Sequence, residues 1–218
     1  GRKFRSGDLS LYLMKFYLSS YRFGNEVDKL QAMLKQGAKI GHINNAKDFT
    51  SADSVRRNQS LIDEIKFLNS LGSRNEHLDL KEYFEQEGKL RVKLQELDGI
   101  WVSGGNTFVL RQAMRLSKFD SLFTELLKRK DFFYGGYSAG FCVLSDSLKY
   151  IQNVDEPNDF PYKEIKEPIW EGLGVFNYAI LPHYDSDHYE SKEIGKEVER
   201  CIANKWLFKT IKDGEVIS

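Results

Sequence analysis

The sequence predicts an α/β protein with a mainly parallel sheet and helices on both of its faces. From about residue 15, short apolar runs alternate with longer amphipathic segments, which is typical of repeated strand–helix units. The chain has 218 residues, and 41% of them are hydrophobic, which is enough to bury one continuous core. We therefore expect a single α/β domain.

Seven short apolar runs predict the strands of this sheet. Each run is four to seven residues long and is bounded by Gly, Asn, Asp or Lys. Such runs are typical of parallel strands that are buried on both faces. The predicted strands are Lys15–Ser19, Ala38–Asn44, Asn75–Leu80, Gly99–Ser103, Phe132–Gly136, Tyr178–Leu181 and Leu207–Ile211.

The segments between these strands predict helices that cover the sheet. They carry apolar residues at a spacing of three and four, as in Leu61, Ile65 and Leu68, and this spacing places an apolar stripe on one face of a helix. The predicted helices are Glu26–Lys35, Ala52–Leu71, Leu80–Leu94, Thr107–Leu116, Phe119–Lys130 and Tyr189–Asn204.

Two segments fall outside this alternation. Ile151–Glu171 holds three of the four prolines and predicts a long loop, and a loop of this length in a compact domain usually has a function such as covering a site. Residues 1–13 fit no strand–helix unit, whereas Met14 leads directly into the first strand. We therefore expect residues 1–13 to be an appended segment and residues 14–218 to form the domain.

Charge and composition exclude several classes of protein. Lys and Arg together number 32, as do Asp and Glu, so the chain lacks the bulk positive charge that drives non-specific nucleic-acid binding. No apolar run approaches the roughly 20 residues of a membrane span, and the first residues lack the apolar core of a secretory signal. Two cysteines, Cys142 and Cys201, are too few for a disulfide framework or a thiolate zinc site. We expect a cytoplasmic protein with no nucleic-acid or membrane partner.

The most informative segment is the turn Gly136-Tyr-Ser-Ala-Gly140, which follows an apolar strand and precedes a short apolar helix. This context predicts a nucleophile elbow. Ser138 would lie on a sharp strand-to-helix turn, with the N–H groups of the helix N-terminus facing developing negative charge. The five-residue pattern alone is also compatible with an ordinary glycine-rich turn, and the flanking strand and helix favour the nucleophile.

A second glycine turn, Ser103-Gly-Gly-Asn-Thr107, follows another predicted strand and opens another helix. Turns at the carboxyl edge of one parallel sheet converge on a crevice. An oxyanion hole needs two N–H donors aimed at one point, and the amides of Gly105 and Ala139 could supply them, with Gly104 as the alternative.

The same turn is open to other interpretations. It could cradle a phosphate, or it could be an ordinary helix cap with Asn106 or Thr107 at the N-terminus. A Walker motif is absent, because no Gly-Lys-Ser/Thr follows. If the turn lines a catalytic crevice, we expect Asn106 and Thr107 to contact the substrate.

A serine nucleophile needs a base, and His183 is the leading candidate among four histidines. It follows the strand Tyr178–Leu181 at a carboxyl end, where a loop side chain can face the crevice. His42 and His77 lie within predicted strands and are expected to be structural, and His188 lies in a polar run before a helix.

The base in turn needs a carboxylate that fixes its tautomer. Asp213, in the turn Lys212-Asp-Gly-Glu215 after the last predicted strand, is the first choice and Glu215 the second. The same Asp-Gly pair is equally typical of a hairpin turn with solvated side chains. The order serine, histidine, acid differs from that of the α/β hydrolases, in which the acid precedes the histidine.

The chain resembles the peptidase E (aspartyl dipeptidase) family from Met14 to its end. The resemblance is carried by Val-Ser-Gly-Gly-Asn-Thr-Phe108, Gly-Tyr-Ser-Ala-Gly140, Leu-Pro-His-Tyr184 with the helix Glu190–Cys201 after it, and Ile-Lys-Asp-Gly214. It implies a class I glutamine amidotransferase-like fold, which is a flavodoxin-like arrangement of three layers. It also implies that Ser138 is the nucleophile, His183 the base, Asp213 the acid in place of the glutamate of peptidase E, and Gly105 and Ala139 the oxyanion donors.

Two features depart from the pattern of this family, and a third position separates the chain from the glutamine amidotransferases. The family usually has three glycines before Asn-Thr, and Ser103 takes the place of the first. The chain ends at Ser218, shortly after the acidic turn, where relatives usually continue into another hairpin. The glutamine amidotransferases carry cysteine at the elbow where this chain has Ser138, and we expect Cys142, four residues later, to pack in the core.

These observations favour a serine peptidase that hydrolyses short peptides, with N-terminal aspartate as the implied preference, through an acyl-enzyme. We expect no metal or other cofactor. The alternatives are a catalytically silent, amidotransferase-like binding module and a metal-dependent hydrolase built on His183, Asp185, Asp187 and His188. A monomer and a homodimer are both compatible with the sequence.

Overall fold

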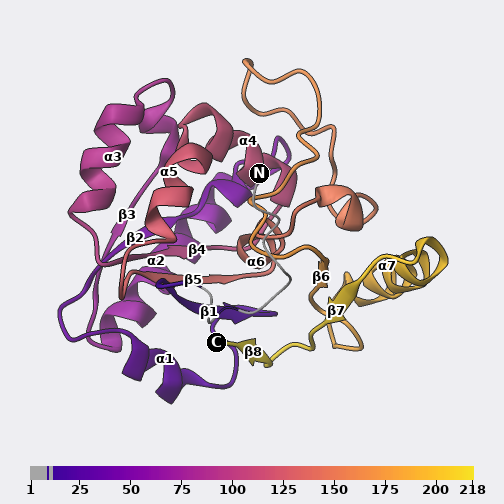
Figure 1. Cartoon of the computed structure of the whole chain (residues 1–218), viewed down its shortest axis with the longest axis horizontal. Helices are drawn as coiled ribbons and strands as arrows, with labels where there is room; N and C mark the ends of the chain where they lie inside the picture. The colour runs from indigo at the N-terminus through magenta and orange to yellow at the C-terminus, as the bar shows by residue number, and fades with distance from the viewer. Residues whose placement is uncertain (1–8, 10–11) are drawn as a thin grey trace.

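The computed structural model describes Leu9 and residues 12–218, and in this part of the chain six strands form a central sheet in the order β3-β2-β4-β5-β1-β8 (Figure 1). The first five are parallel, and β8 pairs antiparallel with β1. The predicted mainly parallel α/β fold is therefore confirmed. The strands are β1 (Lys15–Ser19), β2 (Lys39–Ile43), β3 (Arg74–His77), β4 (Gly99–Val102), β5 (Phe133–Tyr137) and β8 (Val216–Ile217).

Helices cover both faces of this sheet, as the sequence predicts. On one face, Tyr17, Ile40 and Trp101 pack against α1 and α2. On the other, the side chains of Ile100 and Tyr134 pack against α3, α4, α5 and α6. The helices are α1 (Val27–Met33), α2 (Ser54–Ser70), α3 (Glu87–Gln95), α4 (Thr107–Leu116), α5 (Phe119–Leu126), α6 (Ala139–Cys142) and α7 (Ser191–Asn204), with 3-10 turns η2 (Asn45–Lys47), η3 (Leu80–Tyr83) and η4 (Leu148–Ile151).

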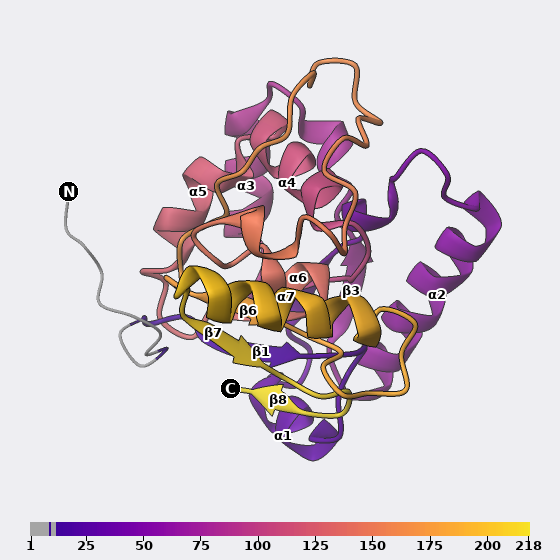
Figure 2. The ribbon, with the colours of Figure 1, turned by 90° about the vertical axis from the view of Figure 1, so that its right-hand side faces the viewer.

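The last two predicted strands do not join the central sheet. Instead β6 (Ala179–Leu181) and β7 (Phe208–Thr210) form a separate parallel pair beside α7 (Figure 2). Both strands exist, but their expected place in the central sheet is wrong. The outer edge of β1 is occupied by β8, which is only two residues long and was not predicted, through the pairs Leu18↔Ile217 and Ser19↔Val216. The pair β6–β7 and α7 therefore form a C-terminal layer against the main domain.

Two other predicted elements differ from the structure. The strand expected at Asn75–Leu80 is the edge strand β3, whose side chains are mostly exposed rather than buried. The helix expected over Leu80–Leu94 is divided into η3 and α3. The break lies at Glu85, which has a left-handed φ of 56° and donates its amide hydrogen to the Leu116 carbonyl oxygen at the end of α4.

The predicted long loop Ile151–Glu171 has no helix or strand beyond the end of η4, and its residues Asp155, Glu156 and Asp159 line the main cavity. Of the predicted appended segment, residues 1–8 and 10–11 lie outside the described residues, and Leu9 and Tyr12 pack against the core. Within the described part of the chain, no helix is both long enough and apolar enough to cross a lipid bilayer.

Gly140 fixes how closely α6 approaches the sheet. A Cβ atom at this position would lie 2.2 Å from the carbonyl oxygen of Val102, at the end of β4. This oxygen belongs to the backbone and cannot rotate away. A glycine at this position therefore lets the helix after the elbow pack directly on the neighbouring strand.

We expect Gly140→Ala to lower the free energy of unfolding by about 1–3 kcal/mol, because overpacking forces backbone shifts. The matched control is Gly195→Ala in α7, where an added Cβ meets no atom within 4 Å. The control should raise stability by about 0.5–1 kcal/mol, because glycine is a poor helix former. Urea unfolding of both variants measures the difference, and equal stability would contradict this account of the packing.

Candidate active site

A cavity of about 720 Å³ opens at the carboxyl edge of the sheet. Much of its lining comes from the segments that follow the strands, as expected for a parallel α/β sheet. These residues are Tyr21 and Arg22 after β1, Lys47 after β2, Gly104, Gly105 and Asn106 after β4, Ser138 after β5, and His183, His188, Tyr189 and Glu190 after β6. The sequence-predicted serine, histidine and glycine turn thus share one cavity.

Ser138 occupies the sharp turn between β5 and α6. Its φ of 48° and ψ of −113° are unusual for a residue other than glycine, and such a conformation costs on the order of 1–3 kcal/mol. The carbonyl oxygen of Ser138 accepts hydrogen bonds from the amides of Phe141 and Cys142, which anchors the turn to α6. Among the described residues no group hydrogen-bonds to its hydroxyl, which faces the cavity and is available to a ligand.

Gly105 lines this cavity, and Ala139 directly follows the cavity residue Ser138. Neither backbone amide has an acceptor in the described part of the chain. Gly105 has a φ of 145°, and a Cβ atom there would lie 2.4 Å from the carbonyl oxygen of Ala46. Only glycine therefore allows this loop to pass so close to η2. The amide of Gly104, the alternative donor, interacts with the Tyr137 hydroxyl.

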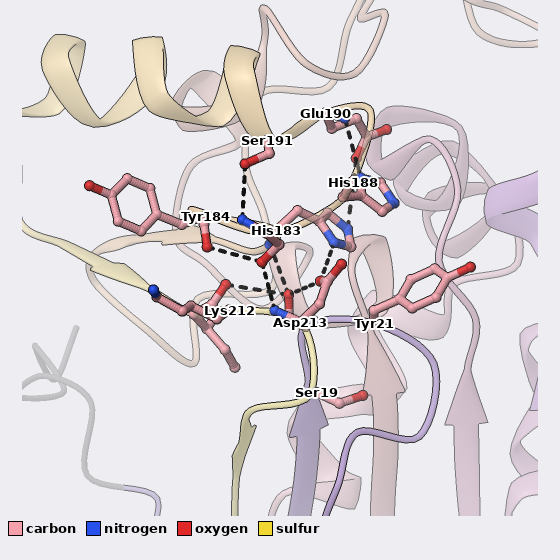
Figure 3. A network of polar contacts seen from close by, with 12 residues as sticks. Ser19, Tyr21, His183, Tyr184, His188, Glu190, Ser191, Lys212 and Asp213 are labelled. Carbon is pink, nitrogen blue, oxygen red and sulfur yellow. Dashed lines mark hydrogen bonds and ion pairs between the residues drawn. The ribbon is translucent and has the colours of Figure 1, made fainter.

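His183 and Asp213 form the central contact of the site (Figure 3). His183 Nδ1 lies 2.6 Å from Asp213 Oδ1, which places the ring proton on Nδ1 and leaves Nε2 as the acceptor. Ser20, at the end of β1, donates its hydroxyl hydrogen to Asp213 Oδ1 at 2.7 Å and accepts one from the His183 amide at 2.8 Å. The contact is thus tied to the central sheet.

Aromatic contacts hold the His183 ring in place. His188 stacks on it with a centroid distance of 3.7 Å and an interplanar angle of 7°, and Tyr21 meets both rings edge-on (Figure 3). Burial and the neighbouring His183 lower the pKa of His188, so His188 is mainly neutral near pH 7. The Glu190 carboxylate lies 3.7 Å from His183 Nε2. In the described residues His183 and Ser138 share the cavity without a direct hydrogen bond.

The structure discriminates between the two carboxylates of the last turn. Asp213 contacts His183, whereas the Glu215 carboxylate accepts the backbone amide hydrogen of Lys212 at 2.7 Å and closes the turn. The amide of Asp213 itself donates to Ser186 Oγ at 2.9 Å. Of the two carboxylates, Asp213 is therefore the one that contacts the histidine.

The structure places the predicted substrate-binding residues Asn106 and Thr107 differently relative to the cavity. Asn106 lines the cavity, but its side-chain oxygen caps α4 by accepting from Phe108 and Val109, and its nitrogen donates to the Glu156 carbonyl oxygen. Thr107 is fully buried and is not among the residues that line the cavity. The interpretation of this pair as a helix cap, also open at the sequence level, fits Asn106.

The alternative metal set of His183, Asp185, Asp187 and His188 does not come together. Asp185 is exposed and pairs with Lys212. Among the described residues, one group of three potential ligands has its ligand atoms within 4.8 Å of one another, namely His183, His188 and Glu190. Of these three residues, His183 already contacts Asp213, and His188 stacks on the His183 ring. His42 and Cys142 lie in the core, as expected, and His77 is exposed on β3.

Sequence reasoning missed Arg22 and Asp155 at this cavity. Arg22 follows β1 by three residues, so the rule that ligands collect after strand ends could have found it. Asp155 comes from the long loop, and its carboxylate accepts the amide hydrogen of Thr107 at 2.8 Å. Burial raises the pKa of Asp155 to about 7, since it outweighs this hydrogen bond, and the Glu190 charge adds to the effect. No local pattern marks such a loop residue.

Comparison with known proteins adds independent information. The model of "Peptidase family S51" matches residues 28–217. The chain is 32% identical over 152 residues to the uncharacterized peptidase Lmo0363 of Listeria monocytogenes, which covers 70% of each chain. It is also 32% identical to the "Probable alpha-aspartyl dipeptidase" of Drosophila melanogaster and to "Peptidase E" of Shewanella oneidensis, over 47% and 44% of this chain and 40% and 37% of those proteins.

Solved structures agree with the family match. A crystal structure of a Listeria monocytogenes protein described as a candidate peptidase E superposes with a TM-score of 0.69 at 25% identity, covering 93% of this chain and 96% of that one. A peptidase from an acI-B1 Actinobacterium shares the fold, with a TM-score of 0.56 at 15% identity over 84% of this chain and 74% of that one.

Proposed function

Because this chain belongs to peptidase family S51 and is a serine-type peptidase, we propose that it hydrolyses short peptides with an N-terminal aspartate, using Ser138, His183 and Asp213. The observation that carries the assignment of residues is the 2.6 Å contact between His183 Nδ1 and Asp213 Oδ1 in the cavity that Ser138 lines. Acyl transfer requires a serine elbow, an oriented histidine and unpaired backbone amides beside the serine.

The chemistry follows from this arrangement. Ser138 Oγ attacks the scissile carbonyl carbon, and His183 Nε2 accepts the hydroxyl proton and later donates it to the leaving amine. Asp213 stabilises the imidazolium. The amides of Gly105 and Ala139 would bind the oxyanion, and one such donor lowers the barrier by about 3–4 kcal/mol. Water then hydrolyses the acyl-enzyme. The missing hydrogen bond between Ser138 and His183 is compatible with this scheme, because such bonds often tighten only when substrate binds.

Arg22 is the cation best suited to an aspartyl side chain. The ammonium of Lys47, also in the cavity, already has three acceptors, Ser60 Oγ at 2.6 Å, Glu64 Oε1 at 2.8 Å and Tyr137 OH at 3.2 Å. Arg22 donates from Nε to the Tyr21 hydroxyl at 3.2 Å, and no carboxylate in the described residues pairs with it. Its terminal N–H groups are therefore free for a carboxylate.

The opposite charge of such a substrate also finds partners in the cavity. A dipeptide with N-terminal aspartate carries an α-ammonium group, and Asp155, Glu156 and Glu190 line the same cavity. Relatives whose names include an alpha-aspartyl dipeptidase and a peptidase E support the substrate class.

The direct test is hydrolysis of a panel of N-terminal aspartyl, glutamyl and neutral dipeptides. We expect the wild type to cleave aspartyl dipeptides best, and Ser138→Ala to lose more than about 10³-fold in kcat/KM, because the nucleophile is absent. Asp213→Asn should also lose activity, since the wrong His183 tautomer is then favoured. A chelator should have no effect.

Glu215→Asp serves as the control for the acidic turn, because Glu215 does not contact His183. Cleavage that survives in Ser138→Ala or disappears with chelator would contradict the serine mechanism. A folded wild type that cleaves no member of the panel would favour the catalytically silent module.

Arg22 makes a separate prediction about selectivity. Arg22→Gln should lower kcat/KM for aspartyl dipeptides by about 10- to 100-fold, the usual loss when a charge-assisted hydrogen bond is removed, and should change kcat/KM for neutral dipeptides little. Arg56→Gln is the matched control, because Arg56 also lines the cavity but lies near Asp53. Equal losses for aspartyl and neutral substrates would show that Arg22 does not bind the aspartyl side chain of the substrate.

A further inference from the structure

We propose that Glu64 on α2 is a positioning residue. It holds the oxyanion loop (residues 103–107) and the nucleophile elbow (residues 136–140) at the separation that catalysis requires. The proposal rests on the function proposed above. Glu64 lies outside the catalytic machinery and is buried, with 5% of its surface exposed. Burying a carboxylate costs free energy unless the group is paired and hydrogen-bonded, so the partners of Glu64 indicate what it does.

One oxygen of Glu64 holds the ends of β2 and β4. Ser103, directly before Gly104 and Gly105, donates its hydroxyl hydrogen to Glu64 Oε2 at 2.7 Å. His42 Nε2 lies 3.1 Å from the same oxygen and 2.9 Å from Ser103 Oγ. Both neighbours accept from the ring, so the ring proton belongs on Nε2. The loop that presents the Gly105 amide is therefore anchored to Glu64 through its first residue.

The other oxygen holds the end of β5 and the turn η2. Tyr137, directly before Ser138, donates its hydroxyl hydrogen to Glu64 Oε1 at 2.8 Å. Lys47 in η2 donates to the same oxygen at 2.8 Å, and Ser60 on α2 donates at 2.9 Å. Since β2, β4 and β5 are neighbours in the sheet, one carboxylate connects the carboxyl ends of three adjacent strands.

The charges and hydrogen bonds around Glu64 keep its carboxyl group in one protonation state. Burial by itself would raise the pKa of Glu64, but the hydrogen bond from His42 and the charge of Lys47 outweigh it and hold the pKa far below its ordinary value. Burial and the Glu64 charge raise the pKa of the Tyr137 phenol well above 10, so Tyr137 remains a donor. The carboxylate is thus ionised and fully engaged at neutral pH.

The consequence for catalysis follows from the neighbours of each donor. Ser103 precedes the loop with the Gly105 amide, and Tyr137 precedes the nucleophile and the Ala139 amide. A displacement of about 1 Å between such groups can cost on the order of 10²-fold in rate. The Ser103 hydroxyl is a link to Glu64 that a residue without a side-chain donor could not provide.

The test compares Glu64→Gln and Ser103→Ala with Asp63→Asn, an exposed carboxylate one residue earlier on α2. We expect Glu64→Gln to lower kcat by about 10- to 100-fold with KM within about 3-fold, because ground-state binding does not depend on the oxyanion geometry. Ser103→Ala should lower kcat by a smaller factor in the same way. Asp63→Asn should match the wild type.

The double variant separates positioning from general stability. If both residues act through one connection, the kcat losses of Glu64→Gln and Ser103→Ala should be less than multiplicative when combined. All assays are made below the onset of thermal unfolding of each variant, and Ser103→Ala decides the question if Glu64→Gln does not fold. Unchanged kcat, or a change in KM alone, would overturn the proposal. A wild type without Ser138-dependent cleavage would instead refute the underlying function.

Discussion

The parallel pairing of β2, β4, β5 and β1 is the constraint on which the rest of the molecule depends. Parallel strands end at the same edge of a sheet, so every turn that follows them opens onto one crevice. The glycine turn after β4 and the elbow after β5 therefore lie next to each other at the cavity, where a Cβ atom on Gly104 would lie 3.0 Å from Ser138 Cβ. Their separation is set by close packing, in which Gly140 rests on the backbone of β4 and Gly105 on that of η2.

The C-terminal layer completes the site through a second constraint, the antiparallel pairing of β8 with β1. This pairing brings the turn that holds Asp213 next to Ser20 at the end of β1, and Ser20 in turn accepts the amide hydrogen of His183. The histidine comes from the layer of β6 and β7, outside the central sheet. A short strand of two residues thus brings Asp213 into contact with His183.

Much of this arrangement could be predicted from the sequence, because local patterns encode it. The elbow at Ser138, the turn at Gly105 and the candidate acid Asp213 lie in contiguous segments with characteristic glycines. What the sequence did not reveal depends on contacts between distant segments. Val216–Ile217 is too short to be recognised as a strand, and Glu64 is an ordinary polar position of an amphipathic helix until the fold buries it beside His42. Arg22 and Asp155 can likewise be recognised as site residues only once the fold places both in one cavity.

The most direct test of the central claim is covalent labelling with an organophosphonate serine probe, followed by mass spectrometry of the intact chain and its peptides. The arrangement described above predicts one adduct per chain, located on Ser138, and its loss in His183→Ala because the hydroxyl is then no longer activated. A folded wild type that forms no adduct, or one that is modified at another residue, would contradict the assignment of Ser138 as the nucleophile.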